Sequence, residues 1–283
     1  MGKLGLICLL CVCSLGVRAQ AERVDIHYAL LSGGDDPHWP YMQALLQLAC
    51  SEMRQHCTLI ADRDMNQGRA MEQMMRGDTV LDVFWGMTSR EREQKLLAVR
   101  IPLDKGLIGW RVPLISAGRP KLLKGVKTRR QLAALRAGQG LDWPDTQILR
   151  GAGLPVVTSP EYLNLFSMLR QQRYDYFPRS VIEVRQELGS PNSQGLMLDP
   201  YLLLHYPTAF YFFVTPRRPE LATLLRQGLE RAVADGSFEQ TFHVFNDEHL
   251  RGLNLSGRTI IELPNALLPP DTPLSRRELW FRP

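Results

Sequence analysis

The sequence lacks the short motifs that mark most enzymes and metal sites. Its 283 residues contain no Gly-x-Ser-x-Gly elbow, phosphate-binding loop, dinucleotide-binding fingerprint or zinc-binding helix. The six histidines are dispersed, and no two of them are four residues apart, the spacing that places a metal-binding pair on one helix face. The residues alone therefore predict no metal, no cofactor and no catalytic activity.

The chain also lacks a strong charge of either sign. It has 34 Lys and Arg against 29 Asp and Glu, a formal net charge of +5, and the two kinds are interspersed. Nucleic-acid-binding domains usually gather basic residues on one face or along one helix. We therefore expect no nucleic-acid partner.

Only one long apolar run is present, and it lies at the N-terminus. It covers residues 4–17, follows Lys3 and precedes Val17-Arg18-Ala19, which is small at the positions that a signal peptidase reads. A run of about 14 residues is shorter than the roughly 20 that a membrane-spanning helix needs. We interpret residues 1–19 as a cleaved secretory signal, with cleavage after Ala19 or Ala21. Loss of Lys3 and Arg18 would lower the charge from +5 to +3.

Cysteine is scarce beyond that run. Three of the five cysteines lie inside it as apolar residues, so only Cys50 and Cys57 remain after processing. Disulfides persist in exported proteins. A bridge here would close a small loop between a helix and the next strand, and two buried free thiols are the alternative.

Hydrophobic periodicity predicts alternating strands and helices, and hence an α/β fold. In the first part of the chain, strands are expected at 24–32, 57–61 and 80–85 and helices at 41–53 and 67–76, the second helix ending at Gly77. A second series of alternating strands and helices follows from residue 113. The aromatic strand at 209–215 and the helix at 219–234 would then return to the lobe formed by the first part of the chain. We expect two lobes, residues 20–112 plus 207–283 and residues 113–206, with two hinge crossings and a central cleft. The tail, from residue 250, is expected to wrap the first lobe.

The third strand is followed by a group of side chains suited to an anion. Trp85, Gly86, Met87 and Thr88 come at its end, and Arg92 follows in a charged run. A strand that stops at a glycine would leave backbone N–H groups free beside a hydroxyl and a guanidinium. Such a site suits a small carboxylate, because arginine presents a planar pair of donors to it.

Several segments resemble one known family in their order and spacing. They are Asp36-Pro37-His38-Trp39-Pro40-Tyr41, the stretch from Met75 to Asp82, Gly86-Met87-Thr88-Ser89-Arg90-Glu91-Arg92, Ile101-Pro102-Leu103, and Ala234-Asp235-Gly236-Ser237-Phe238. Together they resemble the periplasmic solute-binding proteins of the polar amino-acid transporter type, which have the type 2 periplasmic-binding fold. The likeness covers most of residues 22–245.

The resemblance implies a function and a set of site residues. It implies a periplasmic protein, expected to be a monomer, that captures an amino-acid-like or carboxylate-bearing solute by hinge closure and serves an inner-membrane transporter or sensor. The carboxylate would be held by Gly86, Thr88 and Arg92, and the ammonium by Asp199. Trp39 and Trp85 would line the cleft or pack in the core.

The sequence departs from the family pattern at two places, which leaves other interpretations open. The spacing from Gly86 to Arg92 is one residue short, so Arg90 is an alternative to Arg92, and Trp85 replaces a small residue. Asp199, which precedes Pro200, could instead cap a short helix, and Arg179 is a further candidate for an anion. Relatives of this fold include a dehydratase and lytic transglycosylases, so a periplasmic enzyme is one alternative. A sensory or scaffold protein that has lost the ligand site is another.

Overall fold

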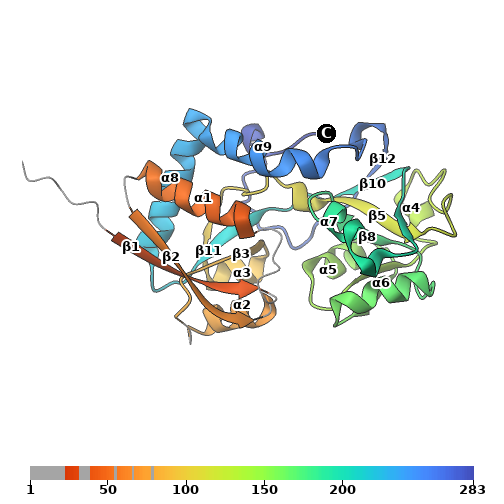
Figure 1. The fold of residues 1–283 in the computed structure, drawn as a ribbon, viewed down its shortest axis with the longest axis horizontal. Coiled ribbons are helices and arrows are strands. Elements are labelled where there is room, and N and C mark those ends of the chain that lie inside the picture. The colour runs from red at the N-terminus through yellow and green to blue at the C-terminus, as the bar shows by residue number, and fades with distance from the viewer. Residues whose placement is uncertain (1–22, 32–38, 54–55, 66, 78–79) are drawn as a thin grey trace, which may run out of the picture.

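The computed structural model describes residues 23–31, 39–53, 56–65, 67–77 and 80–283. They form two α/β lobes that lie side by side, with helix α9 running above the junction between them (Figure 1). The predicted signal at 1–19 and the Asp36-Pro37-His38 turn lie outside the described residues. None of the described helices is both long and apolar enough to span a membrane.

The first lobe is built on a five-stranded sheet of order β2-β1-β3-β11-β4. Strands β1, β2 and β3 run parallel, and β11 is antiparallel to both β3 and β4. The strands are β1 (Arg23–Leu31), β2 (His56–Met65), β3 (Val83–Met87), β4 (Leu97–Val99) and β11 (Phe210–Val214). A strand at 209–215 was predicted from its apolar, aromatic composition, and its return to the first lobe was expected as the simplest topology.

Helices cover both faces of this sheet. Helices α1 and α8 lie on one face and α2 on the other (Figure 1), where Met71 and Met74 of α2 pack with Phe84, Tyr211 and Phe213. The helices of this lobe are α1 (Trp39–Glu52), α2 (Gln67–Arg76), α3 (Arg90–Lys95), α8 (Pro219–Asp235) and α9 (Ser237–Leu250). Helix α2 ends where it was predicted to end, because Gly77 takes a left-handed φ of 75°.

The second lobe has a sheet of order β12-β10-β5-β8, with β9 also paired to β5. The short parallel pair β6 and β7 joins this lobe through a bridge between Ala137 and Tyr176. The strands are β5 (Trp110–Ser116), β6 (Ala137–Gly140), β7 (Val156–Ser159), β8 (Phe177–Ser180), β9 (Leu196–Leu198), β10 (Leu202–His205) and β12 (Thr259–Glu262). The helices are α4 (Arg129–Leu132), α5 (Pro144–Gly151), α6 (Tyr162–Arg170), α7 (Val184–Gly189) and the 3-10 helix η3 (Pro191–Ser193).

Two neighbouring segments connect the lobes as predicted. The first leaves the 3-10 helix η2 (Leu107–Gly109) into β5, and the second runs from β10 to β11. The segments touch directly, since the Tyr206 amide donates to the Gly109 carbonyl at 3.2 Å. A Cβ at Gly109 would stand 2.3 Å from the Tyr206 carbonyl oxygen, so only glycine allows this approach.

The tail makes two further crossings that the sequence analysis did not predict. Strand β12 pairs in parallel with β10 of the second sheet, and residues beyond it return to the first lobe, where the Leu267 carbonyl accepts from the Arg90 amide at 3.3 Å. The 3-10 helices η4 (Leu255–Gly257) and η5 (Arg277–Leu279) flank this path. The end of the tail is attached to the first lobe, because the Phe281 amide donates to the Lys105 carbonyl at 2.8 Å.

The two cysteines that follow the N-terminal run are joined. Cys50 at the end of α1 and Cys57 in β2 form a disulfide with a Cα–Cα distance of 6.0 Å. Of the two alternatives that the sequence left open, the structure has the bridge. It ties the first helix to the edge strand of the first sheet.

Candidate functional site

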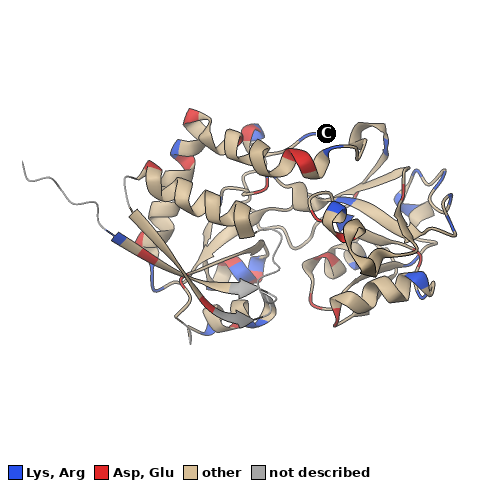
Figure 2. Cartoon of the chain, viewed as in Figure 1, with Lys and Arg blue, Asp and Glu red and all other residues tan. Residues whose placement is uncertain are grey.

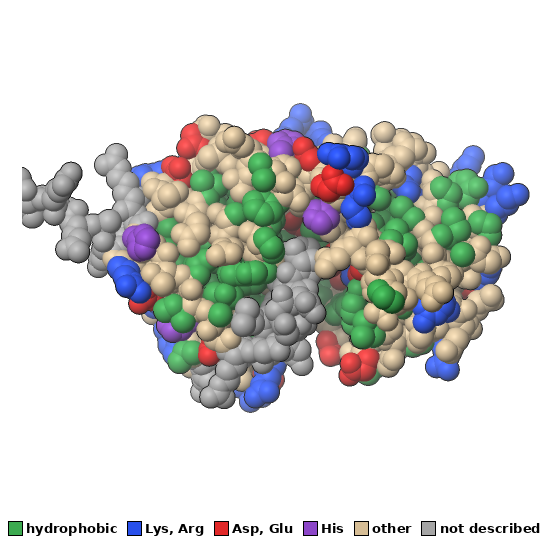
Figure 3. Space-filling view, viewed as in Figure 1, with side chains coloured by type: hydrophobic (Ala, Val, Ile, Leu, Met, Phe, Trp, Pro, Cys, Tyr) green, Lys and Arg blue, Asp and Glu red, His purple; other side chains and the backbone are tan. Residues whose placement is uncertain are grey.

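The first-lobe element that follows the predicted anion-binding strand lies at the junction of the two lobes. Helix α3 lies on the side of the first lobe that faces α5 of the second (Figure 1). Charged positions of both signs occur on these elements (Figure 2), and acidic and basic side chains are interspersed over the visible face of the molecule (Figure 3). The candidate site lies between α3 and α5.

Strand β3 does not end at Gly86, contrary to our expectation. It runs to Met87, and β11 pairs with it along its whole length, with Tyr211 opposite Gly86. The next amides are also occupied, since Thr88 donates to the Ala209 carbonyl at 2.8 Å and Arg90 to that of Leu267. The amides of Thr88 and Arg90 are therefore bonded, because β11 and the tail, both distant in sequence, cover this strand end.

Gly86 has a different role, which is to make room for the side chains of Phe84 and Arg92. A Cβ at Gly86 would stand 2.7 Å from Cε1 of Phe84 and 3.3 Å from Nη1 of Arg92. The guanidinium therefore lies across the strand, where it donates to the Met87 carbonyl. Arg90, the alternative that the short spacing left open, is exposed. Gly86 and Arg92 are thus neighbours, as the sequence analysis required.

Helix α3 holds Arg92 by its own local interactions. The Ser89 side chain caps the helix by accepting from the Arg92 amide at 3.3 Å. Thr88 is buried, and its hydroxyl donates to Oε1 of Glu93 at 2.6 Å. Burial lowers the pKa of Arg92 to about 10, and the carboxylates of Glu91 and Asp145 act in the opposite direction. Arg92 is therefore a cation at neutral pH, and an acid of the second lobe lies within its electrostatic reach.

The two tryptophans of the first lobe form an aromatic cluster with Tyr28. The Trp39 ring stacks on Tyr28 with centroids 4.2 Å apart and on Trp85 at 5.5 Å. Trp85 is buried in the first-lobe core, and Trp39 is partly buried against the same core. Both residues therefore contribute packing to this lobe, and Trp39 keeps a partly exposed edge.

Asp199 lies in the second lobe and is fully buried. Its Oδ2 accepts from the amides of Tyr201 at 2.9 Å and Leu202 at 2.7 Å. Burial raises the pKa of Asp199, while these amides and the charge of Arg258 oppose that effect. The carboxylate thus caps its own turn, as the non-functional interpretation expected, although the cap begins a strand and not a helix.

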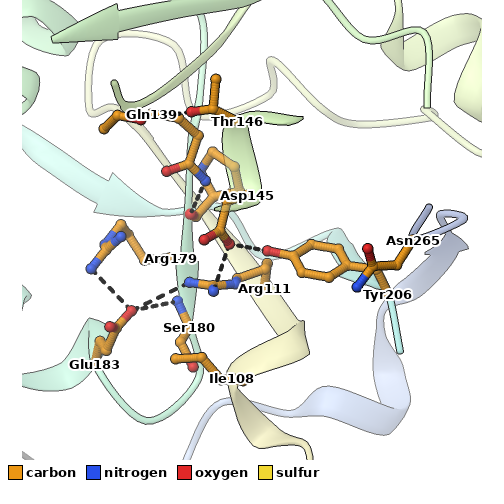
Figure 4. A network of polar contacts seen from close by, with 12 residues as sticks. Ile108, Arg111, Gln139, Asp145, Thr146, Arg179, Ser180, Glu183, Tyr206 and Asn265 are labelled. Atoms are coloured by element: carbon orange, nitrogen blue, oxygen red, sulfur yellow. Dashed lines mark hydrogen bonds and ion pairs between the residues drawn. The ribbon is translucent and has the colours of Figure 1, made fainter. Parts of the chain in front are cut away.

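A buried charge network in the second lobe was not predicted from the sequence (Figure 4). Arg111 of β5 bonds Asp145 of α5 at 2.6 Å and approaches Glu183 to 3.4 Å, and Arg179 of β8 contacts Glu183 at 3.0 Å. The Tyr206 hydroxyl donates to the same oxygen of Asp145 that Arg111 binds. Burial alone would lower the pKa of Arg111, but Asp145 and Glu183 raise it above its ordinary value.

Arg179, considered above as an anion candidate, is saturated by its own lobe. Its Nε donates to Glu187 at 2.7 Å, and its guanidinium lies 4.9 Å from the Trp143 ring centroid. A signal for the whole network was present in the sequence, because a lone arginine between Trp110 and Val112 of an apolar strand needs buried counter-charges. The identity of those counter-charges was not visible from the local pattern.

Comparison with known proteins rests on the fold. No protein-family model matches the sequence, and a comparison with curated proteins found no match. Among solved structures, the chain resembles an arginine-specific periplasmic binding protein of Salmonella typhimurium, at 14% identity and a TM-score of 0.56, over 80% of this chain and 98% of that one. It also resembles the VFT2 domain of BvgS from Bordetella pertussis, at 15% identity and a TM-score of 0.58, over 79% and 93%.

A third similar structure is an ancestral amino-acid-binding protein that is a precursor of cyclohexadienyl dehydratase, at 10% identity and a TM-score of 0.54, over 79% of this chain and 95% of that one. At such identities a likeness establishes the fold alone. The chain has the two-lobe, type 2 periplasmic-binding fold, as the sequence analysis predicted.

Proposed function

We propose that this protein is a periplasmic solute-binding protein that captures a small amino-acid-like or carboxylate-bearing solute when its two lobes close. The observation that carries the proposal is the position of Arg92. Its guanidinium is a cation, lies beside Gly86 near the C-terminal end of β3, and is within electrostatic reach of Asp145 of the second lobe. A fold shared with amino-acid-binding proteins supports the same conclusion.

The carboxylate of the solute would bind to the first lobe. Among the contacts of the described residues, Arg92 donates to the Met87 carbonyl through one nitrogen, Nη1, and the rest of its planar donor set would bind the ligand. The Thr88 hydroxyl lies beside it and would exchange Glu93 for the ligand. Hydrogen bonds to charged groups contribute about 1.5–3 kcal/mol each, enough for a small ligand to favour the closed state.

The proposal includes the partners that such a protein serves. The solute would be handed to an inner-membrane transporter or would signal to a membrane sensor, and the signal-like residues 1–19 support export. Binding, and not turnover, is the expected activity. The neighbour that is a precursor of a dehydratase makes a periplasmic enzyme the second candidate, which predicts slow conversion of a bound compound on prolonged incubation.

Titration calorimetry against the twenty L-amino acids and small carboxylates tests the proposal. The Arg92→Ala variant should bind any ligand so found at least about tenfold more weakly, which corresponds to about 1.4 kcal/mol. Lys95→Ala on the same helix is the matched control, because Lys95 is half-exposed and pairs only with Glu91 at 3.1 Å among the contacts described. If no compound binds, or if Arg92→Ala retains the affinity of the unmodified protein, the proposal is wrong.

A further inference from the structure

Acidic and basic residues are interspersed along the chain except in one stretch of the second lobe. No Asp or Glu occurs between Asp104 and Asp142, and this stretch contains nine Lys and Arg. Two of the nine are buried, and the other seven lie in residues 119–136, here called the basic segment, which lead from β5 through α4 to β6. Figure 2 shows basic positions on the loop around α4, at the end of the second lobe that points away from the first.

The backbone of the basic segment directs three lysines to the same side. Its turns close over three residues, since the Lys124 amide donates to the Lys121 carbonyl at 3.1 Å and the Val126 amide to that of Leu123 at 3.1 Å. In such turns, side chains three residues apart lie on one side. Lys121, Lys124 and Lys127 are accordingly all exposed, while Leu123 is fully buried. The apolar side chain anchors the loop, and the three ammonium groups face the solvent.

A capping box fixes the next two cations. The Gln131 amide donates to the Thr128 hydroxyl at 3.2 Å, and the Thr128 amide donates to the Gln131 side chain at 3.1 Å. Arg129 and Arg130, the first residues of α4, follow Thr128, and both are exposed. Five exposed cations therefore lie between Lys121 and Arg130, on backbone that is held by hydrogen bonds.

These five cations are not neutralised within the protein. None of them forms an ion pair with any residue that the structure describes. Asp175, the acid that borders the basic segment, is taken by Arg119 at 2.9 Å and by Arg136 at 3.5 Å. Two guanidiniums on one carboxylate leave a further positive charge. Because like charges repel one another, this end of the lobe favours a partner of negative charge.

The composition of the basic segment favours a lipid surface over an acidic protein. Protein interfaces are depleted in lysine and depend on a few buried aromatic or apolar anchors. None of the large apolar side chains that are exposed in the described part of the chain lies in the basic segment. Lysine carries a point charge on a flexible stem, which adapts to headgroups that have no fixed arrangement. Several such charges side by side are typical of binding to anionic bilayers.

We infer that the basic segment binds the anionic phospholipid headgroups of the inner membrane. The inference rests on the proposed function for the face of the membrane concerned, because only an exported protein meets the periplasmic one. Binding through this end would hold the second lobe against the bilayer and keep the protein near its transporter or sensor. The candidate solute site lies at the junction of the lobes, so solute capture and membrane contact use different surfaces.

Sedimentation of the full secreted protein with vesicles tests the inference. Vesicles of phosphatidylcholine and phosphatidylglycerol in equal parts should bind the protein at low ionic strength, and vesicles of phosphatidylcholine alone should bind it at least about tenfold more weakly. Salt at about 1 M should release it, because charges are then screened beyond about 3 Å. The triple variant Lys121→Gln, Lys124→Gln and Lys127→Gln should bind the anionic vesicles at least about tenfold more weakly and keep the urea midpoint of unfolding.

The matched control removes three exposed cations from the first lobe and its tail, by Lys95→Gln, Arg226→Gln and Arg277→Gln. It lowers the net charge equally and should keep vesicle binding within about threefold, because charges beyond a Debye length from the bilayer are screened. If it weakens binding as much as the lysine variant, net charge is responsible and the inference is wrong.

The inference is equally wrong if the unmodified protein does not bind the anionic vesicles, and an acidic protein is then the partner of this surface. Neither result affects the proposed function, because calorimetry measures solute binding without vesicles. The lysine variant should keep the affinity of the unmodified protein for any amino acid that binds.

Discussion

Arg111→Met should destabilise the second lobe strongly. The side chain of Arg111 is 2% exposed, and it neutralises the Asp145 carboxylate, which is 6% exposed. Methionine has a similar length but no charge, so the variant would leave Asp145 buried, with the Tyr206 hydroxyl as its remaining partner among the contacts described. Glu183 is less affected, because Arg179 still contacts it at 3.0 Å. Removing one partner of a buried ion pair costs about 3–5 kcal/mol, and we expect a loss in that range.

Urea unfolding followed by circular dichroism measures this loss. It appears as a lower free energy of unfolding for the transition in which the second lobe unfolds. The double variant Arg111→Met with Asp145→Asn should recover at least about 1 kcal/mol, because the stranded charge is removed with its partner. Lys95→Ala, which breaks a pair that is 49% and 68% exposed, should cost at most about 1 kcal/mol. A cost below about 1 kcal/mol for Arg111→Met, or no recovery in the double variant, would refute the reasoning.

Two further predictions concern the first lobe. Gly228→Ala on α8 should lower the urea midpoint of unfolding, because the new Cβ would stand 2.0 Å from the Ala49 carbonyl oxygen. Alanine normally favours a helix over glycine, so the loss would come from this contact. An unchanged midpoint would contradict that packing. The hydrogen bond to Asp247 raises the pKa of the His243 imidazole above its ordinary value near 6.5. The protonated imidazole therefore stabilises the fold fully below about pH 6.5, and this stabilisation is lost as the pH rises through the pKa of the folded state. NMR titration of the ring should show the raised pKa, and Asp247→Asn should lower it; an ordinary value in the unmodified protein would count against the contact.

The elements of the fold could be predicted where the deciding information was local. Helix α2 ended at Gly77 as expected, since hydrophobic spacing and a left-handed glycine act within a few residues. The disulfide between Cys50 and Cys57 and the approach of Arg92 to Gly86 are also short-range, and the sequence indicated both as candidates. The likeness to a known family extended these local patterns to a two-lobe arrangement.

The errors arose where distant segments compete for the same partners. Strand β3 was expected to end with free amides, but β11, more than a hundred residues later, pairs with it through Met87. The tail was expected to stay with the first lobe, but Thr259–Glu262 had an edge of β10 available for pairing in the second sheet. An apolar pattern shows that a strand must be covered, and it does not say which segment covers it.

By itself, the sequence determined the alternation of strands and helices, the scarcity of cysteine, and the absence of the short motifs of common enzymes and metal sites. These are properties of composition and of neighbours along the chain. Only the tertiary structure decided that Arg111 pairs with Asp145 and Tyr206, residues 34 and 95 positions away, at the junction of the lobes (145 − 111 = 34 and 206 − 111 = 95). A buried charge requires a counter-charge, and the fold alone determines which of the chain's acids comes close enough to supply it.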